Sequence, residues 1–537
     1  MKPDQHHTKI PAWQSVGHLL RAQALRMGDQ TLLRFEGRNL SFARVESQTN
    51  QLANVIRALG VQKGNKVAVM MPNGLEYPLC WLALAKLGAI MIPINIQYQA
   101  AELEFVLNNG EADIAIAGQK QIEALKGLKS RCPSLREIVL FSMDSTISGT
   151  GNLCSAMQKA SRECSIDSVQ QDDLLNLQYT SGTTGFPKAC MLSHKYWLQL
   201  GQDMCNYARV TANDVDLTAQ PFYYMDPQWN VVLCLIAGIP LVILPRFSAS
   251  TFWKSVKDNQ VTIFYIIATM PVYLIKQPVN PKIEKKHRVR LVMCSGIVPQ
   301  LHKVFEERWN TIWREVYGST ESGGDLGVPV EDNDSVGTGS VGIPFAGKAF
   351  KILDETGTEV PAGGQGELVI RGEPRMMGYY KNPQASAEKI RNGWLHTGDL
   401  FTKDKKGYYY IVGRLKDMVR RSGENISAAE VEGVLCEHPA VRAAAVVPVP
   451  DELRGEEVKA FIQLQPGENA DPQDIVDFAG AKLATFKMPR FIEFVDCFNM
   501  TPSERIIKRD LLENRNDQRQ GAYDAIEKKW RMDKDEI

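Results

Sequence analysis

The stretch YTSGTTGFPK, residues 179–188, carries more information than any other part of this chain. Two glycines, Gly182 and Gly185, alternate with serine and threonine hydroxyls and are followed by Lys188. A loop of this composition offers backbone N–H groups, hydroxyls and one cation, which together can hold a polyphosphate. Its spacing differs from the Walker pattern of Gly, four residues and Gly-Lys-Ser/Thr. The stretch predicts a phosphate loop of another type, with a flexible turn as the alternative.

Together with MLSH at residues 191–194, this stretch resembles the phosphate-loop signature of the adenylate-forming family of acyl-CoA synthetases, luciferases and peptide-synthetase adenylation domains. Further motifs follow in the family's order, and the resemblance extends over nearly the whole chain. It implies that the loop binds the phosphates of ATP or AMP. The residues that it assigns to this nucleotide are Thr180, Ser181, Gly182, Thr183, Thr184 and Gly185, with Lys188 as a catalytic cation.

The composition limits the class of protein. A chain of 537 residues is too long for one simple core, so two or more domains are expected. Lysine plus arginine and aspartate plus glutamate both number 62, and the zero net charge argues against a nucleic-acid partner. The polar amino terminus lacks the apolar region of a secretory signal, and ten cysteines occur without CxxC spacing. We therefore expect a cytoplasmic protein with reduced core cysteines.

The longest apolar run, WNVVLCLIAGIPLVILP at residues 229–245, is interrupted by Asn230, Gly238 and Pro240. A bilayer span needs about 20 residues, so the run is short for that role. It predicts a buried helix, a turn and a strand, and no transmembrane segment.

Helical and strand patterns alternate through the first 300 residues. Ser41 is a capping residue for a helix that extends to Leu59, and Gly60 ends it. Strands separated by helices predict a mostly parallel sheet with helices on both faces. The expected helices are residues 42–59, 75–87 and 101–107, and the expected strands are residues 66–70, 89–95, 113–117, 241–244, 261–266 and 289–296.

Beyond residue 337 the pattern changes to glycines and short alternating runs, which predict a β-rich subdomain, and then to a small α+β unit. The unit has expected strands at 443–450, 458–465 and 490–495 and a helix at 472–486. The expected fold class is α/β, with a large N-terminal domain of layered α/β subdomains plus the β-rich subdomain, and a small α+β C-terminal lid domain. The expected boundaries are 1–413 for the AMP-binding domain, 414–417 for a hinge, 418–513 for the mobile lid and 514–537 for a charged, partly disordered tail.

The segment YGSTES, residues 317–322, resembles the next nucleotide segment of the family. The resemblance implies that the ring of Tyr317 lies against adenine, that Thr320 lies near the α-phosphate, and that Glu321 binds Mg²⁺. A flat apolar ring suits adenine, and a carboxylate oxygen suits a hard cation that bridges phosphates. A polar strand-to-loop transition is the alternative. The other nucleotide contacts that the resemblance implies here are Ser295, Gly296, Gly318 and Ser319.

Three later segments resemble the ribose, hinge and CoA segments of the family: GWLHTGD at 393–399, GRLKD at 413–417 and VRRSGENIS at 419–427. Asp399 would accept hydrogen bonds from the ribose, because one carboxylate suits two adjacent hydroxyls. Ile411 and Arg414 are implied as further nucleotide contacts, and Lys416 as the hinge. The implied CoA-binding residues are Arg420, Ser422 and Gly423.

The chain departs from the family near its end. The family has T-x-S/T-G-K, whose lysine acts in adenylation, whereas this chain has TPSERIIKRDLL from Thr501. Glu504 replaces the glycine and Arg505 replaces the lysine. Arginine keeps the charge but is longer, planar and forked, so the exchange is not neutral at a packed phosphate. Lys508 could substitute only if the loop shifts. The departure puts efficient adenylation in doubt and affects thioester formation less.

The segment PFYYMDPQW, residues 221–229, looks closest to the crotonobetaine/carnitine-CoA ligase branch of the family. Its candidates for an acyl pocket are Tyr223, Tyr224, Asp226 and Trp229. Aromatic faces with one carboxylate would attract a quaternary ammonium group by cation–π contacts of about 0.5–2 kcal/mol per ring. Ordinary core aromatics and an aspartate at a helix start are the alternative.

The resemblance implies an ATP-dependent acyl-CoA ligase that forms an acyl-adenylate and then a thioester, using ATP, Mg²⁺ and coenzyme A. The implied catalytic residues are Lys188, Thr320, Glu321 and Arg505. One alternative is a member that binds nucleotide or acyl-adenylate with weakened adenylation. Another is a stand-alone adenylation enzyme that loads a carrier protein. The sequence leaves open both the carboxylic acid and the oligomeric state, with a homodimer as one alternative.

Overall fold

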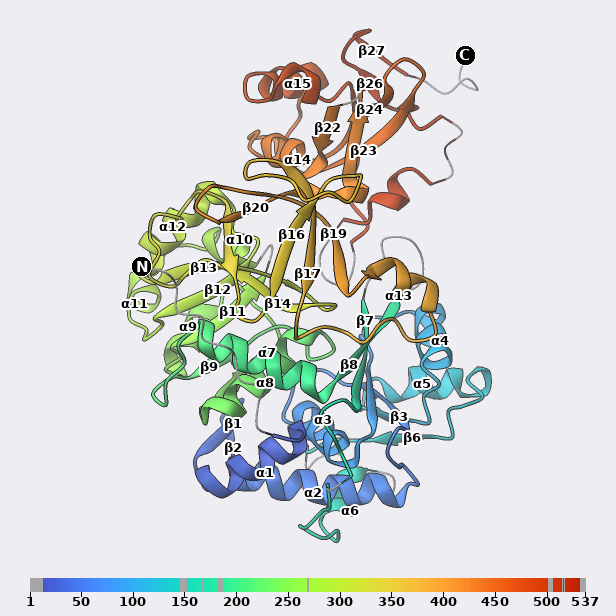
Figure 1. The fold of residues 1–537 in the computed structure, drawn as a ribbon, viewed down its shortest axis with the longest axis vertical. Helices are drawn as coiled ribbons and strands as arrows, with labels where there is room; N and C mark the ends of the chain where they lie inside the picture. Colours follow the sequence, from blue (N-terminus) through green and yellow to red (C-terminus); the bar gives the residue numbers. More distant parts are fainter. Residues whose placement is uncertain are drawn as a thin grey trace. The chain divides into compact units, whose positions relative to one another are not determined.

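The computed structural model describes residues 13–144, 152–166, 168–180, 187–267, 270–422, 424–500, 506–513, 515 and 517–531. The fold is mixed α/β, with a large N-terminal domain and a smaller C-terminal domain, as the alternating pattern predicts (Figure 1). The chain divides into two compact units. The first unit consists of residues 1–182, 186–350 and 370–395, and the second of residues 183–185, 351–369 and 396–537.

One sheet of the first unit has the strand order β6-β5-β3-β4-β7-β8. Its neighbouring strands run parallel from β6 to β7, and β8 returns antiparallel to β7. Successive residues of β3 face opposite sides: Val67 and Val69 pack in a cluster with residues of α2 and α3, whereas Ala68 and Met70 pack with residues of α4 and α5. The strands are β3 (Lys66–Met70), β4 (Ile90–Pro93), β5 (Ile114–Ala117), β6 (Glu137–Leu140), β7 (Leu174–Thr180) and β8 (Lys188–Ser193).

A second sheet of the first unit contains the order β15-β14-β13-β12-β11-β9-β10-β1-β2. The strands from β13 to β1 pair in parallel, and β2, β14 and β15 add antiparallel edges. The strands are β1 (Thr31–Phe35), β2 (Arg38–Ser41), β9 (Asp216–Thr218), β10 (Leu241–Ile243), β11 (Ile263–Ile267), β12 (Leu291–Ser295), β13 (Ile312–Ser319), β14 (Gly323–Gly327) and β15 (Ser340–Pro344).

The helices of the first unit begin and end close to the predicted positions. The side chain of Ser41 caps α2 by accepting a hydrogen bond from the Arg44 amide at 3.2 Å, and Gly88 ends α3 in a left-handed conformation. The helices are α1 (Val16–Met27), α2 (Phe42–Ala58), α3 (Glu76–Leu87), α4 (Ala100–Asn109), α5 (Ile122–Leu128), α6 (Leu153–Met157), α7 (His194–Tyr207), α8 (Met225–Ala237), α9 (Phe252–Asp258), α10 (Met270–Ile275), α11 (Pro281–Glu284), α12 (Pro299–Trp309) and α13 (Pro383–Lys389). The short strand β18 (Ile390–Arg391) follows α13.

The second unit contains the strand run β16-β17-β19-β20 and a separate sheet of order β22-β21-β24-β25-β26-β27, in which β23 also pairs with β24. The strands are β16 (Ala349–Leu353), β17 (Gln365–Arg371), β19 (Trp394–Lys403), β20 (Tyr409–Arg414), β21 (Met418–Arg421), β22 (Glu424–Ser427), β23 (Val441–Asp451), β24 (Gly455–Leu464), β25 (Phe491–Phe494), β26 (Tyr523–Asp524) and β27 (Lys529–Trp530). Its helices are α14 (Ala428–Cys436) and α15 (Pro472–Gly480).

The apolar run at residues 229–245 forms the predicted helix, turn and strand: α8 ends at Gly238, which is left-handed, and β10 follows. Among the described residues, no helix combines the length and the apolar character that crossing a membrane requires.

Three expectations need correction. The helix predicted to reach residue 486 ends at Gly480, which disfavours a helix interior by about 1 kcal/mol, and a 3₁₀ turn follows at Thr485–Lys487. Cys436 and Cys497 are exposed rather than in the core, although all ten cysteines are free. Residues 517–531, predicted to belong to a partly disordered tail, form β26 and β27 and are fixed by buried charge pairs.

Candidate active site

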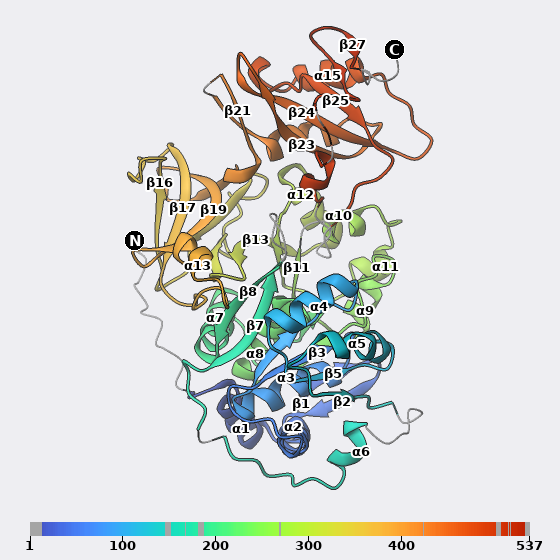
Figure 2. The same cartoon turned by 90° about the vertical axis from the view of Figure 1, so that its right-hand side faces the viewer.

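The two ends of the predicted phosphate loop are held together by the β7–β8 hairpin of the first unit. Thr180 lies opposite Lys188 in the ladder, and the Thr180 hydroxyl donates to the Lys188 carbonyl at 3.3 Å. The phenol of Tyr179, which is buried, donates to the Asn109 side chain at 2.7 Å. Figure 2 shows β7 and β8 as neighbouring arrows. The loop positions Ser181, Gly182, Thr183, Thr184 and Gly185 lie outside the described residues.

A tyrosine that sequence reasoning missed connects two predicted catalytic residues. The phenol of Tyr379 donates a hydrogen bond to Oε1 of Glu321 at 2.8 Å, and Nζ of Lys188 lies 5.4 Å from the centre of the Tyr379 ring. Burial, with the Glu321 charge, raises the pKa of Tyr379 well above its usual value, so the phenol remains a donor. Lys188, Glu321 and Tyr379 therefore form one group.

Backbone hydrogen bonds fix this group in place. The amide of Met376 donates to the Glu321 carbonyl at 2.8 Å, and the amide of Tyr380 donates to the Ala189 carbonyl at 2.9 Å. The segment that carries Tyr379 is thus attached both to the strand after the phosphate loop and to the turn that carries Glu321. A pocket of about 200 Å³ opens beside Lys188 and is lined by Phe105, Asn109, Pro187, Lys188, Ala189, Tyr380, Lys381 and Asn382.

The turn that follows β13 is anchored by a buried ion pair. Nζ of Lys348 lies 2.6 Å from Oδ1 of Asp325, and both side chains are fully buried. The same ammonium group donates to the carbonyls of Ser322 at 2.6 Å and Gly324 at 2.8 Å. The carbonyl of Thr320 accepts a hydrogen bond from the buried Tyr196 phenol at 3.0 Å. The side chains of Lys348 and Tyr196 thereby fix the backbone of the turn, and neither stood out in the sequence.

The carboxyl ends of the parallel strands β12 and β13 bring the predicted nucleotide residues together. Both carboxylate oxygens of Glu315 accept backbone hydrogen bonds at 2.6 Å, one from Gly296 and one from Ile297. Burial raises the pKa of Glu315 to about 8, although these two hydrogen bonds lower it. The loop after β12 is therefore attached to β13, two residues before Tyr317. This edge of a parallel sheet is where α/β proteins place their ligands.

Ser295 and Gly318 have local roles at the same edge. The Ser295 hydroxyl donates to the Val316 carbonyl at 2.6 Å and accepts from the Tyr265 phenol at 3.0 Å. A Cβ atom at Gly318 would lie 2.1 Å from the carbonyl oxygen of Gly323, so only glycine allows β13 and β14 to approach so closely.

The predicted acyl-pocket residues lie at the start of α8 and just before it. Tyr224 is the N-terminal flanking residue, and Asp226 lies in the first turn. Two ring pairs occur here: Tyr223 with Tyr224 at 4.8 Å, and Trp229 with Tyr265 at 5.5 Å. Burial, and then the charge of Asp226, raise the pKa of Tyr265. Trp229 therefore contacts Tyr265 directly.

A buried polar network beside these residues was also missed. The side chain of Gln228 donates to the carbonyls of Phe222 at 3.0 Å and Tyr224 at 3.1 Å, and accepts from the Asn176 amide group at 2.8 Å. The Gln178 side chain donates to the Tyr223 carbonyl at 2.7 Å. The strand that leads into the phosphate loop is thus bonded directly to the segment that precedes α8. The signal in the sequence was a glutamine within an apolar helix.

In the second unit, the antiparallel strands β19 and β20 place Asp399 opposite Arg414. Nε of Arg414 lies 3.1 Å from Oδ1 of Asp399, and the aspartate side chain is 14% exposed. Ile411, on the same strand as Arg414, is an exposed apolar side chain. The predicted ribose carboxylate and its predicted polar neighbour are therefore in direct contact.

The predicted hinge and CoA residues come directly after β20 in the chain. Leu415–Asp417 forms a 3₁₀ turn that includes the hinge position Lys416, and β21 begins at Met418. The exposed Arg420 pairs with Glu355 at 3.0 Å. The amide of Ser422 donates to the Arg454 carbonyl at 2.8 Å. Gly423 lies outside the described residues.

Arg505, the departure from the family, also lies outside the described residues. Lys508, which could substitute for the missing lysine, is engaged elsewhere in the second unit. Its Nζ lies 2.7 Å from Oε1 of Glu432 and 3.8 Å from Oδ2 of Asp417. Burial raises the pKa of Glu432, although the Lys508 charge opposes this shift.

Comparison with known proteins agrees with these features. The family model described as AMP-binding enzyme matches residues 20–380, and the model described as AMP-binding enzyme C-terminal domain matches residues 430–505. A crotonobetaine/carnitine–CoA ligase of Proteus mirabilis (strain HI4320) is 30% identical over 484 residues, which cover 88% of this chain and 93% of that protein. The ligase of the same name from Salmonella typhi is 32% identical over 502 residues, which cover 90% and 96%.

Solved structures of related enzymes are also similar to this chain. The structure of the anthranilate CoA ligase AuaEII in complex with anthranoyl-AMP has a TM-score of 0.84 and 26% identity, and the match covers 93% of this chain and 97% of that one. ATP-bound MatB from Rhodopseudomonas palustris has a TM-score of 0.83 and 26% identity, with 93% and 98% covered. The chain therefore belongs to the AMP-binding enzyme family, as an AMP-forming acid–CoA ligase.

Proposed function

We propose that this ligase activates a carnitine-like or other small to medium carboxylic acid with MgATP and transfers the acyl group to coenzyme A. In the first step, a carboxylate oxygen bonds to the α-phosphorus of ATP, the bond from that phosphorus to the β-phosphate bridging oxygen breaks, and pyrophosphate leaves. In the second step, the CoA sulfur bonds to the acyl carbon, the AMP oxygen leaves, and the thiol proton passes to solvent.

The observation that carries this proposal is the contact of Tyr379 with both Lys188 and Glu321. Because the Tyr379 hydrogen bond fixes Oε1 of Glu321, the other carboxylate oxygen would be available to a cation. One carboxylate together with substrate phosphates is the donor set that Mg²⁺ uses in nucleotide sites, so the residues fit this ion. When bound, Mg²⁺ would neutralise charge on the phosphates. Lys188, Thr320 and residues 180–185 would hold the same phosphates, and preorganised charge is usually the largest catalytic contribution.

The second unit supplies the remaining roles in this proposal. Asp399, oriented by Arg414, would accept hydrogen bonds from the ribose hydroxyls. Rotation of the C-terminal domain about Lys416 would remove residue 505 from the active site. It would bring in the loop of Arg420, Ser422 and Gly423, which would contact CoA. Such a domain movement excludes water in each of the two steps.

ATP–pyrophosphate exchange with a panel of carboxylic acids tests the first step, and CoA-dependent release of AMP tests the complete reaction. We expect both activities in the purified full chain. Failure of every acid to support exchange, together with no binding of MgATP in calorimetry, would remove the proposed function.

The substrate class is supported by Asp226, in the first turn of α8, and by Trp229 of the same helix, whose ring contacts that of Tyr265. A carboxylate beside aromatic faces attracts a quaternary ammonium group. We expect calorimetry to show roughly 10-fold tighter binding of a trimethylammonium acid than of its neutral isostere, which corresponds to one cation contact. The substitution Asp226→Asn should abolish this preference. Equal affinities in the wild-type protein would exclude a cationic acid.

A second candidate is a ligase whose adenylation step is slow because arginine occupies position 505. The ion pairs of Lys508 with Glu432 and Asp417 favour it, because they keep the neighbouring lysine from replacing the missing one. We expect Arg505→Lys to raise the rate of ATP–pyrophosphate exchange several-fold, since a compact ammonium group fits a packed phosphate better than the guanidinium fork. Lys508→Met is the matched control and should leave exchange unchanged. A lower rate in Arg505→Lys would mean that the arginine is adapted to its own substrate.

A further inference from the structure

The C-terminal segment 517–531 is built into the sheet of the second unit, beyond the residues that the C-terminal family model matches. Strand β26 pairs with β25, where Asp524 lies opposite Phe491, and β27 pairs with β26. Ala522 and Asp524 are fully buried. The segment is therefore part of the folded unit, and one of its carboxylates lies in the interior.

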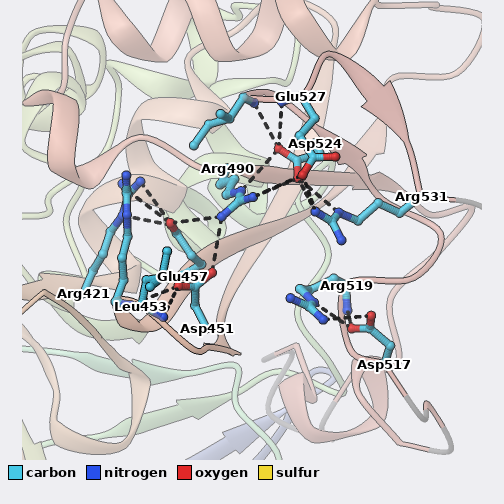
Figure 3. Close-up of polar contacts among 12 residues, drawn as sticks. Arg421, Asp451, Leu453, Glu457, Arg490, Asp517, Arg519, Asp524, Glu527 and Arg531 are labelled. Atoms are coloured by element: carbon cyan, nitrogen blue, oxygen red, sulfur yellow. Dashed lines mark hydrogen bonds and ion pairs between the residues drawn. The ribbon is translucent and has the colours of Figure 1, made fainter.

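Asp524 is the centre of the contacts that this segment makes (Figure 3). Its Oδ2 accepts hydrogen bonds from Nη2 of Arg490 at 3.2 Å and from Nη2 of Arg531 at 2.8 Å. Its Oδ1 accepts from the backbone amides of Ile526 at 3.0 Å and Glu527 at 3.2 Å. Burial alone would raise the pKa of Asp524, but the bonds from the arginines outweigh it and lower the pKa. The carboxylate is ionised and held from several directions.

Arg490 connects Asp524 with a second buried carboxylate. While Nη2 faces Asp524, Nη1 lies 3.6 Å from Oε1 of Glu457 and 3.3 Å from Oδ2 of Asp451. Glu457 is fully buried. Arginine suits this bridging position because its planar fork presents donors to two carboxylates at once, which a lysine cannot do.

Glu457 in turn holds the end of β21. Nε of Arg421 lies 2.9 Å from Oε2 of Glu457, and Nη2 donates to Oε1 at 3.2 Å. A third donor of Arg421, Nη1, reaches the Phe486 carbonyl at 2.9 Å. In Figure 3 these side chains form one connected series from Asp524 through Arg490 and Glu457 to Arg421.

Arg421 lies between the two described residues of the proposed CoA loop. The amide of Arg420 donates to Oε2 of Glu456 at 2.6 Å, and the amide of Ser422, which has a φ of 54°, donates to the carbonyl of Arg454. The Arg420 side chain points outward and is exposed, whereas that of Arg421 is buried. The inward side chain thus fixes a loop whose neighbouring residues remain accessible.

We propose that the C-terminal segment positions the loop of Arg420 and Ser422 for acyl transfer to CoA, with Asp524 and Arg490 as positioning residues. This inference rests on the proposed role of that loop in CoA binding. Without the Asp524 charge, Arg490 would turn its free donors toward Glu457 and compete with Arg421. Arg421 would then no longer fix the loop, while the groups that act in adenylation would be unaffected.

The test uses Asp524→Asn in the full chain and measures the two half-reactions separately. We expect CoA-dependent thioester formation to fall roughly 10-fold, as a misplaced substrate-positioning group can cause, and ATP–pyrophosphate exchange to be unchanged. Asp517→Asn is the matched control, because Asp517 pairs with Arg519 within the same segment, apart from the Arg490 series in Figure 3. It should leave both half-reactions unchanged. Arg490→Lys, which keeps the charge without the fork, should resemble Asp524→Asn.

Hydrogen exchange of the loop gives a readout that does not depend on catalysis. Hydrogen exchange in peptides covering residues 418–427 should be faster in Asp524→Asn than in the wild-type protein, whereas peptides covering β3 of the first unit should not change. An equal loss of rate in both half-reactions of Asp524→Asn would overturn the inference. Unchanged hydrogen exchange in residues 418–427 would also overturn it. Should the wild-type protein adenylate no acid at all, the proposed function fails. The hydrogen-exchange data still decide whether the C-terminal segment controls the loop.

Discussion

Replacing Glu321 by glutamine is expected to slow ATP–pyrophosphate exchange by roughly 100- to 1,000-fold, the loss that follows removal of one preorganised charge contact. Glutamine has nearly the same shape, and its side-chain oxygen can still accept the hydrogen bond that Tyr379 donates to Oε1 of Glu321 at 2.8 Å. The negative charge, which a hard cation requires, is lost. Exchange rates measured over a range of Mg²⁺ concentrations, with melting temperatures of both proteins, check this expectation.

Tyr379→Phe is the matched comparison, because it keeps the carboxylate and removes the phenol that orients it. We expect a smaller fall of roughly 10-fold and a higher Mg²⁺ requirement, since outer hydrogen bonds to a metal-binding group typically have effects of this size. Calorimetry should show that the glutamine variant has lost the difference in affinity between ATP with and without Mg²⁺. Near wild-type exchange in that variant would remove Glu321 from the catalytic groups.

Much of the fold could be predicted because local signals and tertiary packing agree. Residues 67–70 of β3 are a continuous apolar run, as burial on both faces of the sheet requires. Ser41 and Gly88 mark helix ends, Ser41 through its side-chain cap and Gly88 through its left-handed backbone. The segment 517–531 could not be predicted in this way. Its charges are typical of an exposed tail, and its burial depends on contacts with residues distant in sequence, such as the ion pair of Asp524 with Arg490.

The site shows the same division between local and distant information. Thr180 and Lys188 flank a recognisable loop, so their proximity follows from the sequence. Tyr379 lies in a segment without a recognised motif, and its link to Glu321 arises from backbone hydrogen bonds between segments far apart in the chain. Arg505 is a clear departure in sequence, but its consequence depends on contacts outside the described residues.

Lys348→Met is expected to have the largest effect on stability, lowering the free energy of unfolding of the N-terminal domain by about 3–5 kcal/mol. Nζ of Lys348 and Oδ1 of Asp325 are 2.6 Å apart and fully buried. Removing the ammonium group would leave an uncompensated carboxylate in the interior. It would also deprive the carbonyls of Ser322 and Gly324 of a donor. Urea unfolding followed by tryptophan fluorescence measures the loss.

The double variant Lys348→Met with Asp325→Leu separates the charge from the packing. Removing both partners of a buried ion pair is often nearly neutral, because the desolvation cost disappears together with the attraction. The double variant should therefore recover more than half of the lost stability. Its ATP–pyrophosphate exchange should stay low, however, because the ammonium group also fixes the turn that carries Glu321. If Lys348→Met were as stable as the wild-type protein, the ion pair would contribute little to stability. If the double variant recovered activity together with stability, the Lys348 ammonium group would not be needed to fix the turn that carries Glu321.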